Sequence, residues 1–312
     1  MLLLSAVNEF LNYCQFEKRL SEKTLKAYRT DLTQLAAFLK EKSYPNEIDK
    51  ISKTELRDYL ASLVSLKHKT IKRKIASAKA LFNYLEFEDH IIVNPFRKMR
   101  VTIREPKRLP KVMDIREITR IFRKAYGSIQ QQTIPGSYQH FTFLRDVVIV
   151  ELLFNTGARV SEIADLTRDN INLETGSILI KGKGDKERNI QICNREALDS
   201  IKQYYKLYGS KIKEAGNYFL VNRIGNKLSD QSIRLIIKNL AREAGLTKHI
   251  TPHIFRHSFA TLLLEQDVDI KYIQSLLGHS SIVTTQIYTH VNRAQQKKIL
   301  RTKHPRKSMV ML

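Results

Sequence analysis

Residues 251–291 read TPHIFRHSFATLLLEQDVDIKYIQSLLGHSSIVTTQIYTHV, and this stretch holds the most informative motif of the chain. It places His253, Arg256, His279 and Tyr288 close together in sequence. Two imidazoles and a guanidinium can bind and polarise a phosphate diester, and a phenol can attack it and hold the phosphoryl group as a covalent ester. The stretch therefore predicts phosphodiester chemistry.

Helix signals frame these side chains. The Thr-Pro pair at 251–252 predicts a helix start, because threonine can cap a helix and proline is favoured at the first helical position. His253 and Arg256 would then share one face of that helix. Gly278 predicts the end of the following helix, which leaves His279 in the turn after it.

The composition of the whole chain favours a partner that is a nucleic acid. The length of 312 residues exceeds one hydrophobic core and suggests two domains, and a hydrophobic content of 42% indicates a globular protein. Fifty-four Lys and Arg against 31 Asp and Glu give a net charge of +23, although charge alone also fits an RNA-binding protein. No apolar run approaches the ~20 residues that span a membrane. Cys14 and Cys193 are too few and too far apart for a disulfide framework, which favours a reducing cytoplasm. Together with the positive charge, this leads us to expect a cytoplasmic, nucleoid-associated protein and no membrane partner.

Residues 1–95 are predicted to form a helical domain. Ser21 and the capping box of Ser52 and Glu55 each precede apolar residues at helical spacing. A third helix, from about Lys69, would bury one face and expose a basic one that either lies in a DNA groove or is simply solvated. The residues of this face that we expect to bind DNA are Lys69, Lys72 and Arg73.

Residues 96–111, FRKMRVTIREPKRLPK, are predicted to be a basic interdomain linker. They hold seven Lys or Arg, one Glu and two Pro, a composition that opposes a packed helix. Beside DNA, such a linker would clasp phosphates without reading the base sequence. The linker side chains that we expect to bind DNA are Arg97, Lys98, Arg100 and Arg104.

Residues 112–312 are predicted to form a mostly helical second domain with one hairpin, so the chain is expected to be mainly α with a small β-sheet. Residues 177–192, SILIKGKGDKERNIQI, place β-branched residues on both sides of a Gly-Lys-Gly-Asp turn, which is typical of a hairpin. Asp114 and Glu117 form another capping box. The glycines and proline of 124–140, KAYGSIQQQTIPGSYQH, predict a surface loop, to which we assign no role.

Further motifs join the first stretch. They are LSEKTLKAYRTDL near the N-terminus, NTGARVSEIADL at 155–166, KGKGDKER in the hairpin, and HIFRH and LLGHSSIVTTQIYTHV within 251–291. With these motifs the chain resembles the tyrosine recombinases along nearly its whole length, and most closely the Xer branch of bacterial site-specific recombinases. The resemblance implies an N-terminal SAM-like, core-binding helical domain and an α+β catalytic domain that together clamp DNA.

The resemblance also implies six catalytic positions, each of which holds the expected residue type. They are Arg159, Lys183, His253, Arg256, His279 and Tyr288. Arg159 and Arg256 are suited to the non-bridging oxygens of the scissile phosphate, where negative charge builds up in the transition state. Taken alone, Arg159 fits equally well a structural salt bridge to Glu162 or Asp165.

The remaining roles follow from side-chain chemistry. Tyr288 would be the nucleophile, and its phenol pKa near ~10 calls for a base, for which His253 is the candidate. His279 would donate a hydrogen bond to the phosphate, or else interact with a helix dipole as a structural residue. Lys183, in the hairpin turn, would protonate the departing 5′ oxygen, although two other lysines lie close by.

A phosphotyrosyl ester conserves the energy of the broken bond, so we expect no cofactor. Acidic clusters for two-metal nuclease chemistry are missing from the quoted motifs, so we expect no metal. Ile254 stands where a His-Glu-x-x-His zinc protease needs its glutamate, and the chain has no P-loop sequence. The resemblance implies strand exchange at a double-stranded recombination site through a 3′-phosphotyrosyl intermediate and a Holliday junction. It also implies a homotetramer, or a heterotetramer with a paralogous recombinase, in which a helix at about 293–308 docks on a neighbour. The alternative for that segment is a frayed basic tail.

For the biological role, the resemblance favours Xer-like chromosome dimer resolution. An integrase or transposase of a mobile element or phage is the main alternative, and a type IB topoisomerase is a more distant one. A non-enzymatic DNA-binding regulator of the same fold would be expected to have lost at least one of the six residues.

Overall fold

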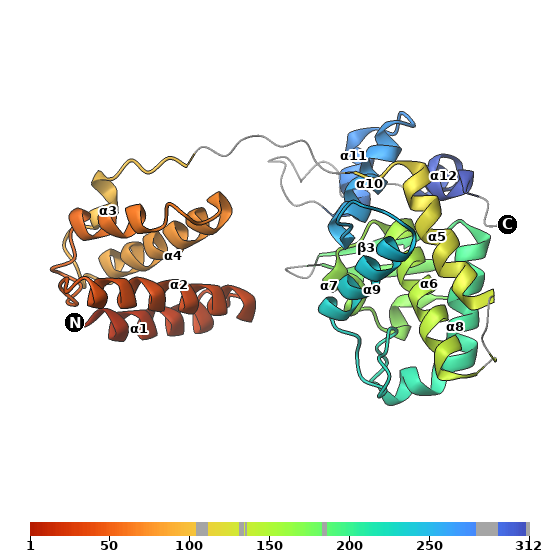
Figure 1. Cartoon of the computed structure of the whole chain (residues 1–312), viewed down its shortest axis with the longest axis horizontal. Helices are drawn as coiled ribbons and strands as arrows, with labels where there is room; N and C mark the ends of the chain where they lie inside the picture. The colour runs from red at the N-terminus through yellow and green to blue at the C-terminus, as the bar shows by residue number, and fades with distance from the viewer. Residues whose placement is uncertain (104–111, 131–133, 135, 183–185, 279–292, 310–312) are drawn as a thin grey trace. The chain divides into compact units, whose positions relative to one another are not determined.

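The computed structural model describes residues 1–103, 112–130, 134, 136–182, 186–278 and 293–309. The chain forms two compact units, Met1–Arg108 and Leu109–Leu312, and each is considered by itself. Figure 1 labels helices α1 to α12 and strand β3.

The first unit is a helical bundle closed by a 3-10 turn. Its described elements are α1 (Leu3–Phe16), α2 (Glu22–Glu41), α3 (Lys53–Ser62), α4 (His68–Phe87) and η1 (Pro95–Lys98). The hydroxyl of Ser21 accepts from the Thr24 amide at the start of α2. Ser52 and Glu55 form the predicted capping box of α3, with the Ser52 amide 2.8 Å from the Glu55 carboxylate. Both helix-start predictions are therefore confirmed.

The 3-10 turn η1 belongs to the core of the first unit. Phe96 is buried and packs edge-on against Phe82 of α4, and Met99 is buried in the same core. The first residues of the segment that was expected to be a linker are therefore part of this unit, because Phe96 and Met99 both face its core.

The second unit is mostly helical and is built around one central helix. Its described helices are α5 (Ile115–Gln130), α6 (Tyr138–Thr156), α7 (Val160–Ala164), η2 (Arg168–Asn170), α8 (Arg195–Glu214), α9 (Asp230–Glu243), α10 (Pro252–Leu264), α11 (Ile270–Leu277), α12 (Arg293–Lys303) and η3 (Pro305–Ser308). In α6 the run 147–154, VVIVELLF, is buried on every side, and α5, α8 and α10 pack around it. A helix that is apolar all round is expected at the centre of a core.

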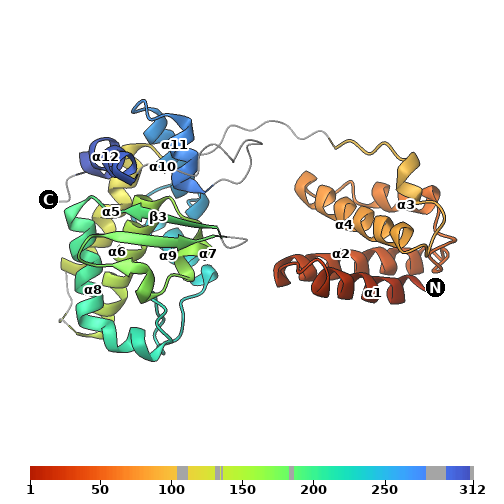
Figure 2. The ribbon, with the colours of Figure 1, turned by 180° about the vertical axis from the view of Figure 1, so that it is seen from behind.

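A small antiparallel sheet lies on the near side of this unit in Figure 2. Its strands, in spatial order, are β1 (Ile171–Asn172), β2 (Ser177–Lys181) and β3 (Glu187–Gln191). Ile178 of β2 pairs with Ile190 of β3, and both side chains point into the core. The hairpin prediction is confirmed, while residues 183–185 of its turn lie outside the described residues.

The prediction of a surface loop at 124–140 is wrong for most of its length. α5 continues to Gln130 and α6 begins at Tyr138, so residues 124–130 and 138–140 are helical. Ala125 is buried against the core, and Gly127 is accommodated within the helix. Packing of the apolar side of α5 on α6 therefore outweighs the local preference of Gly127 for a turn.

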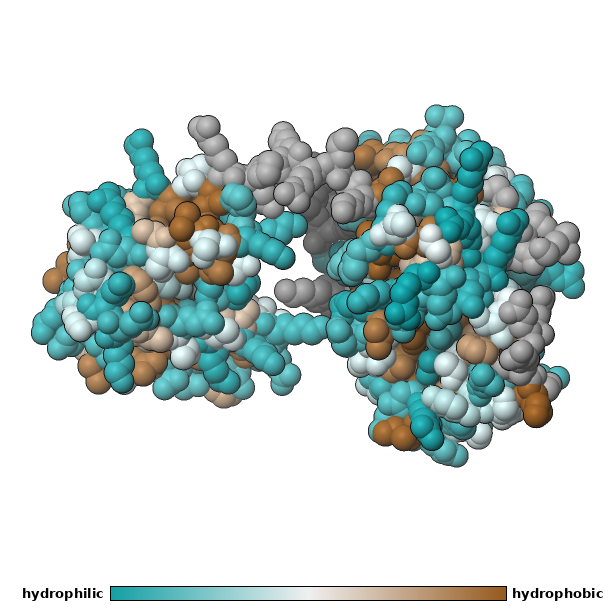
Figure 3. All heavy atoms as spheres, viewed as in Figure 1, coloured by the Kyte–Doolittle hydropathy of each residue, from teal (hydrophilic) through white to brown (hydrophobic). Residues whose placement is uncertain are grey.

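The surface of the face seen in Figure 3 is largely hydrophilic, with apolar side chains in separate spots. Among the residues that the structure describes, no helix is long and apolar enough to cross a membrane.

Candidate active site

Arg159 lies at a sharp turn between two helices. α6 ends at Thr156, the capping residue Gly157 has a left-handed φ of 58°, and Arg159 directly precedes the first residue of α7, Val160. A Cβ atom at Gly157 would come within 2.6 Å of the Phe259 ring, so glycine is required here for space as well as for conformation. Glu162 accepts from the Arg159 amide at 2.8 Å and from its guanidinium at 2.7 Å. The salt bridge considered from the sequence is therefore present, and it fixes the direction of the Arg159 side chain.

Arg256 approaches the same turn from α10, a helix that begins at Thr251 and Pro252 as predicted. Its side chain is 6% exposed. The guanidinium donates to the Gly157 carbonyl at 2.9 Å and to the Leu277 carbonyl at 2.6 Å, joining the ends of α6 and α11. Burial, together with the charge of Arg159, lowers the pKa of Arg256 to about 10, so it stays cationic at neutral pH.

His253 lies one turn before Arg256, on the exposed side of α10. Partial burial lowers its pKa, and the neighbouring His257 and the positive charges of Arg234, Arg256 and Arg159 lower it further. His253 is therefore neutral at physiological pH and able to accept a proton.

Arg188 of β3 is a member of this cluster that the sequence reasoning did not single out. Its guanidinium donates to the Glu162 carboxylate at 2.7 Å and to the Leu276 carbonyl at 2.9 Å. Burial would raise the pKa of Glu162, but hydrogen bonds from Arg188 and Arg159 outweigh it and hold that pKa below its usual value. Arg188 is the last residue of the motif KGKGDKER, and this position was the only indication of its importance that the sequence offered.

The described part of the site thus joins Arg159, Arg256 and His253. Arg159 lies about a hundred residues before His253 and Arg256 in the sequence. Arg256 donates to the Gly157 carbonyl beside Arg159, and both arginines lower the pKa of His253. The other predicted site residues, Lys183, His279 and Tyr288, lie outside the described residues.

The basic residues expected to bind DNA differ in how firmly they are held. Lys69 and Lys72 are exposed on α4. Arg73 is also exposed, but it forms an ion pair at 2.5 Å with Asp31, a buried aspartate of α2. Arg97 pairs with Glu86 at 2.9 Å. Of the other linker residues, Lys98 and Arg100 are exposed, and Arg104 lies outside the described residues.

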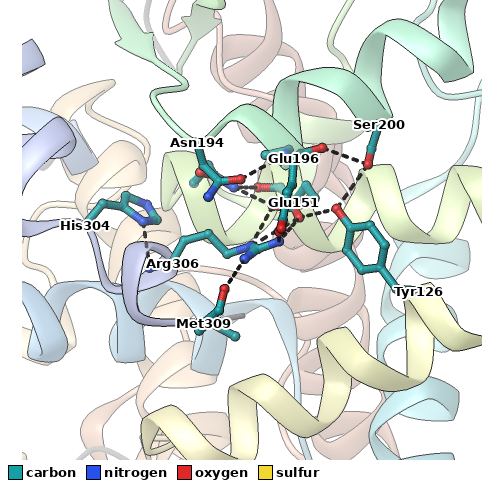
Figure 4. A network of polar contacts seen from close by, with 10 residues as sticks. Tyr126, Glu151, Asn194, Glu196, Ser200, His304, Arg306 and Met309 are labelled. Atoms are coloured by element: carbon teal, nitrogen blue, oxygen red, sulfur yellow. Dashed lines mark hydrogen bonds and ion pairs between the residues drawn. The ribbon is translucent and has the colours of Figure 1, made fainter. Parts of the chain in front are cut away.

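The C-terminal segment packs on its own unit in this single chain. Leu300 of α12 is buried, as are Arg306 of η3 and Met309 after it. Figure 4 shows Arg306 reaching Glu151 of α6 and Glu196 of α8. For its described part, the alternative of a frayed tail is therefore wrong.

In the part of the chain that is described, no three His, Cys, Asp or Glu side chains gather as a metal site would require.

Comparison with known proteins defines the class. Residues 132–295 match the phage integrase family, and residues 7–89 match the N-terminal SAM-like domain of phage integrases. The chain belongs to this family of tyrosine recombinases and is a site-specific DNA recombinase. The predicted resemblance, the two kinds of domain and the class of enzyme are confirmed.

Individual relatives cover nearly the whole chain. It is 46% identical over 306 residues to a tyrosine recombinase of Agathobacter rectalis, with 98% of each protein covered. It is 33% identical to tyrosine recombinase XerD of Listeria innocua, with 96% of this chain and 98% of the relative covered. The fold is similar to that of the XerH recombinase bound to a palindromic difH substrate, with a TM-score of 0.67, 22% identity, and 95% and 94% of the two chains covered.

Proposed function

We propose that this recombinase cleaves one DNA strand at a time by attack of Tyr288 and holds the strand as a 3′-phosphotyrosyl ester. The observation that carries the proposal is the link between Arg159 and Arg256. Arg256 donates to the carbonyl of Gly157, two residues before Arg159, so both guanidiniums are held at the same turn. A pair of fixed guanidiniums is suited to a phosphate whose negative charge grows during the reaction.

The charge balance of the cluster supports phosphate binding. Glu162 neutralises one of the three guanidiniums of Arg159, Arg188 and Arg256, and the cluster keeps a net positive charge. The scissile phosphate supplies the missing negative charge. In this account Arg159 and Arg256 bind its non-bridging oxygens, and His279 donates a further hydrogen bond.

Proton transfer is assigned to two groups. His253, kept neutral by its surroundings, accepts the proton of the Tyr288 hydroxyl as the phenolate attacks phosphorus. The bond to the 5′ oxygen breaks, and Lys183 gives that oxygen a proton. In the reverse direction, a 5′ hydroxyl attacks the phosphotyrosyl bond and releases Tyr288. Exchange of the attacking strand produces a Holliday junction.

We further propose that the enzyme acts as a tetramer on double-stranded DNA in the cytoplasm, with the exposed basic side chains of α4 and the linker on the DNA backbone. The segment 293–308 would leave its own unit and dock on a neighbour, which closes a cyclic assembly. Because deleting the segment would also remove Arg306, the partner of the buried Glu151, the test changes exposed side chains of α12 instead. Lys297→Glu with Lys298→Glu should still bind a half-site but fail in strand exchange. Full recombination by this double variant would contradict cyclic docking.

Xer-like chromosome dimer resolution is the biological role that we favour, on the strength of the whole-length relatedness to XerD. The test uses supercoiled plasmids with two copies of the host's dimer-resolution site or of a mobile-element end, in EDTA. The proposal predicts recombinant circles and Holliday junctions from the dimer-resolution site. Recombination of the element end alone would favour an integrase, and relaxation without recombinants would favour a topoisomerase.

A further inference from the structure

Arg188 is a largely buried arginine whose contacts converge on the two catalytic arginines. It is 10% exposed and stands on β3, a strand that carries no residue of the proposed reaction. The carboxylate of Glu162 is divided between two guanidiniums: one oxygen accepts from Arg159 at 2.7 Å and the other from Arg188 at 2.7 Å. The second oxygen also accepts from the Arg159 amide. Glu162 is therefore held from both sides.

The other contact of Arg188 lies at the end of α11. Arg188 donates to the carbonyl of Leu276 and Arg256 donates to that of Leu277, so two guanidiniums bind consecutive carbonyls of the last helical turn. Gly278 ends the helix with a φ of 63°, and a Cβ atom there would lie 3.0 Å from the Arg188 guanidinium. Arg188 thus packs directly on the residue that precedes His279.

We propose that Arg188 is a positioning residue for the catalytic arginines. Its hydrogen bond to Glu162 fixes the carboxylate that orients Arg159. Its hydrogen bond to the Leu276 carbonyl fixes the end of α11, where Arg256 binds the Leu277 carbonyl. The inference rests on the proposed roles of Arg159 and Arg256. An arginine is needed because its planar fork presents donors in two directions at once, whereas a lysine ammonium could satisfy one of these partners and leave the other unmet.

Two other roles for Arg188 give different results. It could act through Lys183, which lies five residues before it in the sequence, or it could stabilise the fold without affecting the phosphate. A substrate series separates these possibilities, because each catalytic group acts on a different atom. A methylphosphonate at the scissile position removes one anionic oxygen, which reduces the need for arginine. A 5′ bridging sulfur removes the need for a general acid.

The experiment measures single-turnover cleavage by the full chain on nicked suicide substrates of all three kinds. Arg188→Met and Arg188→Lys are compared with wild type and with Arg195→Met, a control at a side chain that is 95% exposed. We expect Arg188→Met to lose about 100-fold on the ordinary phosphodiester, as when one oxyanion donor is removed. The loss should shrink to a few-fold on the methylphosphonate and stay unchanged on the sulfur substrate, and Arg188→Lys should restore little.

The ratio of rates on two substrates is read within one protein preparation, so it does not depend on how much of the variant is folded. Equal losses on all three substrates would overturn the inference in favour of a purely structural role. Rescue by the 5′ sulfur alone would also overturn it, because Arg188 would then act through Lys183. If wild type itself forms no covalent adduct, the proposed function fails instead.

Discussion

The guanidinium of Arg306 lies 2.9 Å from the carboxylate of Glu151, and both side chains are fully buried. The Tyr126 hydroxyl donates to the same carboxylate at 2.6 Å, and Glu196 accepts from Arg306 at 2.8 Å. Burial raises the pKa of Glu151, while the charge of Arg306 opposes this rise. One residue near the C-terminus therefore neutralises a carboxylate at the centre of the catalytic unit.

Replacing Arg306 by Met should strongly destabilise the second unit, because it leaves Glu151 buried without a cation. Loss of one partner of a buried ion pair costs about 3–5 kcal/mol. Chemical denaturation should show a fall of this size in the free energy of unfolding, and the double variant Arg306→Met/Glu151→Gln should recover part of it. Arg301→Met, at an exposed position of α12, is the matched control. An Arg306→Met protein as stable as this control would refute the anchoring role.

The pH dependence of cleavage should report on His253. Partial burial and nearby positive charges lower its pKa below 6.5, so the base is lost as pH falls through that lowered value. Arg234→Gln removes one of these charges, which favours the protonated imidazole and raises its pKa. The acidic limb of the cleavage profile should therefore move to higher pH. Arg242→Gln, an exposed change on the same helix, should leave the limb in place. A limb that Arg234→Gln does not move would argue against His253 as the base.

Salt dependence tests the basic linker. Each phosphate contact contributes a slope of about −0.9 to the log–log plot of affinity against salt. Neutralising Lys98, Arg100 and Arg104 should flatten the slope and leave the preferred sequence nearly unchanged. Neutralising Arg97 should have a smaller effect, because Glu86 already shares its charge. An altered preferred site with an unchanged slope would show that these residues read bases instead.

Lys183 should be separable from its neighbours by leaving-group chemistry. Lys183→Ala should be nearly inactive on ordinary DNA and substantially restored on the 5′ bridging-sulfur substrate, because a thiolate leaves without a proton. Arg256→Ala should stay impaired on both substrates. The neighbouring changes Lys181→Ala and Lys186→Ala are the controls, and rescue of either of these in place of Lys183→Ala would move the general acid to that lysine.

The sequence predicted features that are fixed locally. The capping box of Ser52 and Glu55 and the left-handed cap at Gly278 each depend on a few adjacent residues, and both are present. The loop prediction at 124–140 was mostly wrong because a glycine suggests a turn locally, whereas burial of Ala125 against the core favours continuing the helix.

Pairs that are distant in sequence were not predictable from one chain. Arg188 lies 26 residues after Glu162, and Arg306 lies 155 residues after Glu151. Either arginine could equally have been a solvated surface charge, since the sequence does not state which carboxylate becomes buried. Packing of the complete unit decides both pairings.

The nucleophile is the most direct test of the whole account. Wild type and Tyr288→Phe are incubated with a nicked suicide substrate in EDTA, and the covalent adduct is digested and mapped by mass spectrometry. Wild type should accumulate a 3′-phosphate ester on the peptide that contains Tyr288, whereas Tyr288→Phe should bind the duplex equally well and form no adduct. An adduct on a peptide with a different tyrosine, or one that persists in Tyr288→Phe, would contradict the account.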